Sequence, residues 1–286
     1  MLPAEFEYAA PESLDEALAL LTGGGNVRIL AGGQSLLTTL KLRLDRPDLV
    51  VDLRKISELR YVREEEGEIA IGALTTYAEL LASDTIGSGV TRCLAEAASS
   101  VGDLQVRNLG TIGGSLSHAD PAADIPAAAL ALECALVARS EEGDRTIAVD
   151  DFFHGLWTTA LLPSEMLREI RFRKASGGGA YEKLRQAASG FALVGAAAVV
   201  HMDGDTIAGA RVALTGVASG PFRLHALEER LSGETLGEEL VRDVCDEAGE
   251  AIESPLSDVH ASAEYRMAMA GVTSRRAILR AAGLVA

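Results

Sequence analysis

Two pairs of adjacent glycines, each placed where an apolar run meets a polar turn, constrain this sequence most. Residues 31–35 read AGGQS, and residues 111–115, about eighty positions later, read TIGGS. Because glycine has no Cβ, such turns expose backbone N–H groups and let a bulky anion approach closely. Two turns of this kind can bind the two phosphates of a dinucleotide from both sides. Neither matches the G-x-G-x-x-G fingerprint, so a Rossmann-type NAD site is disfavoured.

Length and charge narrow the class of protein. With 286 residues the chain can form two or three small domains with real cores. Its 48% hydrophobic and 24% charged residues are typical of a soluble globular protein. The formal net charge of −16 disfavours nucleic acid and anionic membranes as partners, because both would repel it. The longest uncharged apolar run, residues 191–200, is too short to cross a bilayer.

Cysteine usage and the N-terminal sequence indicate the compartment. Cys93, Cys134 and Cys245 are odd in number, far apart and form no C-x-x-C pair. We therefore expect neither a disulfide framework nor a metal or iron–sulfur site. The first residues contain no basic stretch followed by an apolar run, so we expect no secretory signal and a cytoplasmic protein.

The first fifty-five residues are expected to form a small α/β unit. Residues 13–16 have the form of a capping box, which predicts a helix that ends at the glycines of 23–25. Residues 27–31 read as a short buried strand that leads into the first glycine pair. A second helix is expected from residue 36 and another strand at 48–53.

A second segment opens near residue 56. Ile69 and Ile71 alternate with Ala70 as in a strand, and residues 76–79 form another capping box. Residues 94–101 are expected to be helical. After the second glycine pair, Pro126 fits the first turn of an alanine-rich helix.

The third segment is predicted to combine an antiparallel sheet with helices. The glycines at 177–179 are the best candidate for a linker, and Asp203-Gly204 between two apolar runs is a strong hairpin signal. Apolar residues recur at every fourth position over 236–252, which indicates one helix. Ser262 is placed to cap a last helix. The expected fold class is α+β.

Each glycine pair also has a purely structural explanation. Gly32 and Gly33 alone can turn a strand into a helix, and the second pair can be a turn between packed elements. Polar neighbours favour anion binding, since Gln34 and Ser35 follow the first pair and hydroxyls flank the second. We expect Ser35 to cap the helix that follows it.

Few other residues suggest chemistry. Asp124 can either charge a helix N-terminus or bind ribose hydroxyls, while Asp120 is assigned the structural role. Lys183 would ordinarily be a solvated strand charge, and Trp157 a core or interface residue. His118 has no partner nucleophile, and the other histidines lack ligand spacing. We predict no catalytic residue and no metal site, so a bound cofactor would supply the reactive atoms.

Both glycine segments, with their flanks, resemble the FAD-binding medium subunit of the molybdenum hydroxylase family, the group of carbon monoxide dehydrogenase and xanthine dehydrogenase. The likeness covers nearly the whole chain and rests on residues 31–44, 110–124, 181–185 and 264–266. It implies two N-terminal α/β lobes, at 1–55 and 56–175, that together form an FAD-binding unit of the PCMH type. It also implies a C-terminal domain of the CO dehydrogenase flavoprotein kind at 177–286.

The resemblance further implies which residues contact FAD. The pyrophosphate would be wrapped by two stretches: Ile29, Leu30, Ala31, Gly32, Gly33, Gln34, Ser35 and Leu36, and then Thr111, Ile112, Gly113, Gly114 and Ser115. Asp124 would bind a ribose or ribityl hydroxyl. Val101, Leu167 and Lys183 would approach the flavin ring or the adenine.

Partners are implied as well: a molybdopterin-binding large subunit and a two-iron two-sulfur small subunit, assembled as a dimer of heterotrimers. Electrons would pass from the iron–sulfur clusters through FAD to an external acceptor, for which NAD and a quinone are both open. The isolated cysteines disfavour the subclass that carries a cluster-binding loop in this subunit. Two alternatives are a stand-alone FAD-dependent oxidoreductase and a non-enzymatic nucleotide-binding module.

Overall fold

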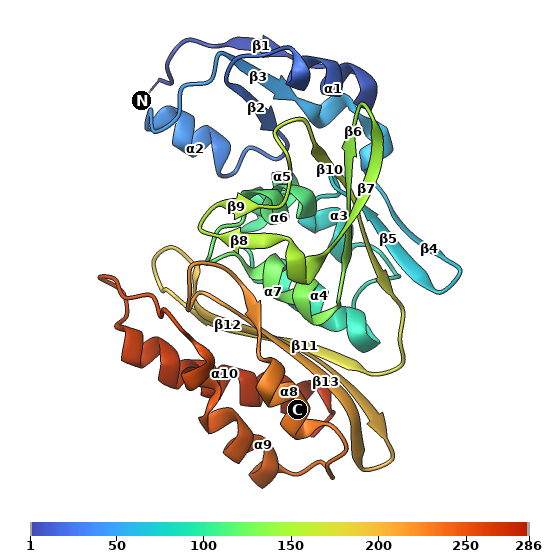
Figure 1. The fold of residues 1–286 in the computed structure, drawn as a ribbon, viewed down its shortest axis with the longest axis vertical. Coiled ribbons are helices and arrows are strands. Elements are labelled where there is room, and N and C mark those ends of the chain that lie inside the picture. The colour runs from blue at the N-terminus through green and yellow to red at the C-terminus, as the bar shows by residue number, and fades with distance from the viewer. Residues whose placement is uncertain (1, 285–286) are drawn as a thin grey trace.

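The structure, a computed structural model, describes residues 2–284 and has three successive units along its longest axis (Figure 1). Each unit is built on its own sheet, and helices fill the space between the second and third sheets. The fold is mixed α and β with antiparallel sheets in the C-terminal part, which confirms the expected class. No helix within residues 2–284 combines the length and the apolar character needed to span a bilayer.

The first unit is a parallel three-stranded sheet in the order β1 (Glu7–Ala9), β3 (Leu49–Asp52), β2 (Val27–Leu30). Two helices, α1 (Leu14–Thr22) and α2 (Leu36–Lys41), accompany it. At the start of α1 the Ser13 hydroxyl accepts the N–H of Glu16, as expected of a cap. The Glu16 carboxylate instead accepts the N–H of Glu12, so only half of a capping box forms.

The second unit is an antiparallel five-stranded sheet with most of its helices on one face. Its strand order is β4 (Val62–Glu65), β5 (Glu68–Gly72), β10 (Met166–Arg173), β6 (Ala135–Ser140), β7 (Gly143–Ala148). The helices are α3 (Tyr77–Leu81), α4 (Arg92–Ser99), α5 (Leu104–Leu109), α6 (Ile112–His118) and α7 (Asp124–Ala131). Thr76 and Glu79 form the full capping box of α3, and Pro126 lies in the first turn of α7, both as predicted.

The third unit is an antiparallel sheet in the order β11 (Gly178–Arg185), β12 (Ala192–Asp203), β13 (Thr206–Thr215), β14 (Phe222–Arg223). One face packs on α8 (His225–Leu231) and α10 (Ala263–Ala281), with α9 (Glu238–Asp246) against these two helices, and the other face packs on α4 and α7 of the second unit. Along β12, Ala196 and Ala198 belong to one core and Ala197 and Val199 to the other. Because alternate side chains of a strand point to opposite faces, this sheet joins two cores.

Several expectations about local structure are corrected. Gly178 and Gly179 are paired in β11 with Val200 and Val199, so they belong to the sheet instead of a free linker. The helix expected over 236–252 ends at Asp246 and is followed by a separate 3₁₀ turn at Ala248–Ala251. Trp157 is 62% exposed at the tip of the hairpin β8 (Phe153–Gly155) and β9 (Thr158–Thr159), which excludes a core role.

Candidate functional site

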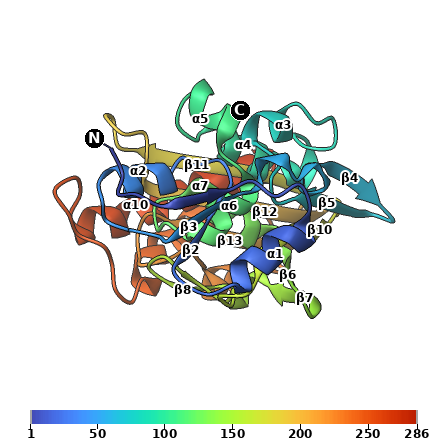
Figure 2. The ribbon, with the colours of Figure 1, turned by 90° about the horizontal axis from the view of Figure 1, so that it is seen from above.

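The two glycine segments, far apart in sequence, lie against each other. A Cβ added at Gly32 would stand 2.1 Å from the carbonyl oxygen of Leu109, just before the second segment. A Cβ added at Gly114 would stand 3.8 Å from the Cβ of Ala31. Figure 2, the view from above, shows the strands of the first unit lying over the second unit. The structure therefore brings both loops to one place between the first and second units.

The first loop carries a run of unused donors. Within residues 2–284, the backbone N–H groups of residues 32–36 donate to no protein acceptor. Gly33 has φ +74°, a left-handed conformation that side chains with a Cβ rarely adopt. Ser35 precedes α2, but its hydroxyl makes no capping hydrogen bond, contrary to expectation. Five consecutive amides without a protein acceptor, around one left-handed residue, offer donors suited to phosphate oxygens.

The second loop is tied back to the protein. The N–H groups of Ile112 and Gly113 donate to the carbonyls of Thr75 and Ala73, at 3.0 and 2.9 Å. Gly114 donates to the Thr111 hydroxyl at 3.1 Å, and Ser115 to the Thr111 carbonyl at 3.1 Å. The expectation of bare amides is thus met by the first loop and is wrong for the second. There the glycines allow close packing, and the Ser115 side chain is the remaining polar group.

Tyr77 supports the second loop from below. Its N–H donates to the Gly110 carbonyl at 3.1 Å. A Cβ added at Gly110 would stand 2.8 Å from Cε2 of the Tyr77 ring, so the ring packs directly against this glycine. Burial raises the pKa of Tyr77 to about 12, with a hydrogen bond to Ser115 acting in the opposite direction. A neutral phenol is therefore fixed beside Ser115 throughout the physiological pH range.

Asp124 and Lys183 form a buried ion pair. Asp124 is the first residue of α7 and is 5% exposed, and the Lys183 side chain on β11 is 4% exposed. The Lys183 Nζ donates to Asp124 Oδ2 at 2.8 Å and to the Ser100 carbonyl at 3.1 Å. The structure therefore excludes the solvated alternative for Lys183.

Tyr181 supplies the other contact to this carboxylate, since its hydroxyl donates to Asp124 Oδ1 at 2.6 Å. Burial raises the pKa of Asp124, and the Lys183 charge and the two hydrogen bonds counter only part of that shift. Burial and the nearby Asp124 charge raise the pKa of Tyr181 well above 10. Tyr181 was not singled out from the sequence. Its position two residues before Lys183 was the available signal, because alternate residues of a strand share a face.

The other residues predicted to contact the flavin ring or the adenine, Val101 and Leu167, differ in burial. Val101 is half-buried and follows Ser100, whose carbonyl accepts the Lys183 ammonium. Leu167 lies on β10 opposite Ala138, with 6% exposure, inside the core of the second unit. His118 is 3.9 Å from Asp120 and partly exposed. Residues 2–284 contain no group of three or more His, Cys, Asp or Glu side chains arranged to hold a metal.

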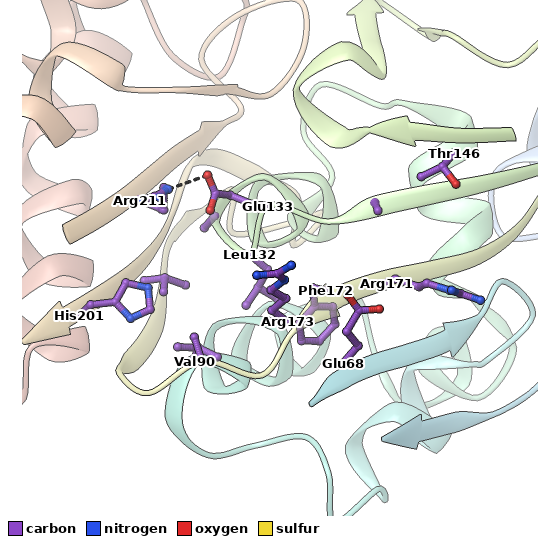
Figure 3. Close-up of a pocket in the computed structure, with 14 residues that line it drawn as sticks. Glu68, Val90, Leu132, Glu133, Thr146, Arg171, Phe172, Arg173, His201 and Arg211 are labelled. Atoms are coloured by element: carbon purple, nitrogen blue, oxygen red, sulfur yellow. Dashed lines mark ion pairs between the residues drawn. The ribbon is translucent and has the colours of Figure 1, made fainter. Parts of the chain in front are cut away.

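A separate pocket of about 610 Å³ lies between β10 and the strands β12 and β13 (Figure 3). Arginines 171, 173 and 211 line it together with His201 and Glu133, and Arg211 pairs with Glu133 at 2.7 Å. None of the residues predicted from sequence to contact a cofactor lines this pocket.

The residues at the two loops fit a dinucleotide with a diphosphate bridge. Free amides and a neutral hydroxyl suit phosphate oxygens, and the missing Cβ atoms let the two loops approach closely. The Asp124 carboxylate can accept hydrogen bonds from sugar or ribityl hydroxyls.

Comparison with known proteins supports this interpretation. Residues 4–173 match the family described as the FAD binding domain in molybdopterin dehydrogenase. Residues 179–281 match the CO dehydrogenase flavoprotein C-terminal domain. The chain is 41% identical to the carbon monoxide dehydrogenase medium chain of Hydrogenophaga pseudoflava, over 97% of each chain. It is 38% identical to the glyceraldehyde dehydrogenase medium chain of Sulfolobus acidocaldarius, over 97% of this chain and 98% of that one.

Solved structures of the same family have the same fold as this chain. A carbon monoxide dehydrogenase from Hydrogenophaga pseudoflava that lacks the Mo-pyranopterin moiety superposes with a TM-score of 0.95 at 40% identity, covering all of both chains. Quinoline 2-oxidoreductase from Pseudomonas putida 86 has a TM-score of 0.92 at 33% identity, covering 99% of each. This chain therefore belongs to the family of FAD-binding medium subunits of the molybdenum hydroxylases, and it is an oxidoreductase subunit whose cofactor is FAD.

Proposed function

We propose that this subunit holds FAD between its two glycine loops and relays electrons from iron–sulfur clusters on a partner chain to an external acceptor. The observation that carries the proposal is the run of free amides at residues 32–36, placed directly against the second loop. A diphosphate would give those donors their missing acceptors. The FAD contacts expected for residues 29–36, 111–115, Asp124, Val101, Leu167 and Lys183 form part of this proposal.

The two loops have different tasks in this account. The first binds the diphosphate through its amides, and Gly32 lets it approach the backbone of the second. The second presents Ser115 from a fixed backbone. Asp124 accepts a hydroxyl of the cofactor, and the Lys183 ammonium pairs with that buried carboxylate at 2.8 Å.

When bound, FAD supplies a ring that accepts electrons singly and releases them as a pair. The protein contributes placement and shielding from water. The Lys183 ammonium, buried and held by the Asp124 carboxylate and the Ser100 carbonyl, fixes the orientation of that carboxylate.

We propose a molybdopterin-binding large subunit and a two-iron two-sulfur small subunit as partners, joined as a dimer of heterotrimers in the cytoplasm. Several relatives carry "medium chain" or "medium subunit" in their names, which supports a heteromeric assembly. Substrate oxidation would then take place on the large subunit.

Purification from the native host tests the proposal. We expect this chain to co-purify with a larger and a smaller chain and to show a flavin absorption spectrum with one FAD per medium subunit. Substrate-dependent flavin bleaching should require the partner chains. A colourless protein that takes up no added FAD would contradict the cofactor site, and turnover by this chain alone would instead support the stand-alone oxidoreductase.

A further inference from the structure

Three adjacent strands of the third unit present one row of residues toward the Asp124 segment. Lys183 on β11 pairs with Gly195 on β12, and Gly195 pairs with Thr215 on β13. Tyr181 lies two residues before Lys183 on the same face. The row lies in the sheet that packs on α7, which begins at Asp124.

Thr215 binds the backbone just before Asp124. Its Oγ1 lies 2.9 Å from the carbonyl oxygen of Pro121 and 2.8 Å from that of Ala123, so one hydroxyl proton is shared between two acceptors. The N–H of Gly216 donates to the same Pro121 carbonyl at 2.7 Å. Arg266 on α10 in turn donates to the Gly216 carbonyl at 2.7 Å, which braces this turn from the far side of the sheet.

Gly195 makes room for these contacts. A Cβ at this position would stand 2.2 Å from the Tyr181 hydroxyl oxygen and 2.7 Å from the Thr215 Cγ2. Any side chain here would displace the Tyr181 hydroxyl from Asp124 or push Thr215 away from the 121–123 backbone. The backbone at Gly195 is an ordinary paired strand, which any residue can adopt. Glycine is therefore required here because the Tyr181 and Thr215 side chains fill the space of a Cβ.

We propose that Tyr181, Gly195 and Thr215 are positioning residues for FAD binding, which fix the Asp124 carboxylate and its backbone from the C-terminal sheet. The inference rests on the proposed FAD site. It adds that the part of the site built on residues 111–124 is complete only when the third unit is docked. Holding the carboxylate before FAD arrives removes an ordering cost from binding.

The test compares four variants of the full chain with the wild type. Tyr181→Phe removes the hydroxyl bonded to Asp124, and Thr215→Val removes the hydroxyl bonded to the 121–123 backbone. Thr215→Ser keeps that hydroxyl as the conservative rescue. Tyr61→Phe is the matched control, because the Tyr61 hydroxyl also donates to a buried carboxylate, Glu169, within the five-stranded sheet.

FAD dissociation constants and the visible circular dichroism of bound flavin are the readouts, with urea unfolding of the FAD-free chain measured in parallel. We expect Tyr181→Phe and Thr215→Val to weaken FAD binding about five- to tenfold, the loss of roughly one hydrogen bond, and to alter the dichroism. Thr215→Ser and Tyr61→Phe should retain the wild-type constant and spectrum.

The inference is overturned if Tyr181→Phe and Thr215→Val bind FAD with the wild-type dissociation constant and dichroism spectrum. This holds even if their free energy of unfolding falls as much as that of Tyr61→Phe, because the lost hydroxyls would then affect only stability. Failure of the wild type to bind FAD would overturn the proposed function itself. If Tyr181→Phe does not fold, Thr215→Val against Thr215→Ser decides the question alone.

Discussion

The two glycine loops look alike in sequence and differ in their physical state. In the first, the amides of residues 32–36 have no protein acceptor within residues 2–284, and its candidate cap, Ser35, makes no capping bond. In the second, Thr111 caps its helix, and the amides of residues 112–115 all donate to protein oxygens. The first loop has donors that a ligand can fill, while the amides of the second are held by the protein's own oxygens.

This contrast extends to the surroundings of each loop. The first unit contributes a small parallel sheet with two small clusters of buried apolar residues, one of which also includes Leu74 and Met166 of the second unit. The second loop continues into residues 120–124, which are held by the C-terminal sheet and by a buried ion pair. Polar groups fully satisfied inside a protein rigidify it, whereas unsatisfied donors are available for recognition. The donors open to a ligand are thus concentrated in the first loop, whereas the second loop and residues 120–124 are expected to contribute more to stability.

The largest effect is expected from Lys183→Met, which leaves the buried Asp124 carboxylate without its ion-pair partner. We expect a loss of about 3–5 kcal/mol in the free energy of unfolding, measured by urea denaturation. Lys174→Met is the matched control, because its pair with Glu64 is half exposed and worth about 0–1 kcal/mol. Equal losses in the two variants would contradict the assignment of this pair to a buried, stabilising role.

The next effect tests the contact between the loops. Gly32→Ala places a methyl group 2.1 Å from the Leu109 carbonyl, so the loops must separate. We expect about 1–3 kcal/mol of destabilisation from overpacking, and an FAD dissociation constant raised about tenfold or more. Gly23→Ala, whose added Cβ meets its nearest atom at an ordinary 3.5 Å, should change neither. Wild-type FAD affinity in Gly32→Ala would show that the loops need not touch.

A smaller effect is expected to distinguish Thr111 from Ser35, the residues that precede the helix after each glycine loop. Thr111→Val removes a hydroxyl that accepts the Gly114 amide and should cost about 1 kcal/mol in unfolding free energy. Ser35→Ala removes a hydroxyl with no capping bond and should leave stability unchanged within about 0.5 kcal/mol. Thermal or urea unfolding of the FAD-free variants measures both. The opposite ranking would reverse the comparison between the loops.

The smallest effect concerns pH and two buried carboxylates. At Asp52 in the first unit, burial acts to raise the pKa, but hydrogen bonds from Arg54 and Tyr8 outweigh it and hold the pKa below 3.8. Its contribution to stability is therefore present above pH 3.8 and is lost as pH falls through the lower folded pKa.

At Asp124 the folded pKa is raised above 3.8, so its contribution is present below that pH and is lost as pH rises through the folded pKa. Asp52→Asn and Asp124→Asn should therefore change the pH dependence of the unfolding free energy across the acid range in opposite directions. Changes in the same direction would be evidence against this difference between the two regions.

Much of the fold could be predicted because local signals agree with the final structure. The capping box at Thr76, the Asp203-Gly204 hairpin and the cap at Ser262 all form, since each depends on residues close in sequence. Gly178 and Gly179 misled because their place in a strand depends on pairing with β12, a distant element.

The candidate site was predicted in outline through its glycine segments and the resemblance they carry. The pattern could not show that the amides of Ile112 and Gly113 are already used, because their acceptors, the carbonyls of Thr75 and Ala73, lie far back in the chain. Nor could it show that Lys183 is buried, since a strand lysine in YEKLR is typical of a solvated face. Tertiary contacts decide both points.

Hydrogen exchange with and without FAD tests the central claim most directly. We predict that amides 32–36 exchange fast in the FAD-free chain and become strongly protected when FAD is added. Amides 112–115 should be protected in both states, because their acceptors belong to the protein. Equal exchange in the two loops without FAD, or no added protection at 32–36 with FAD bound, would contradict the account.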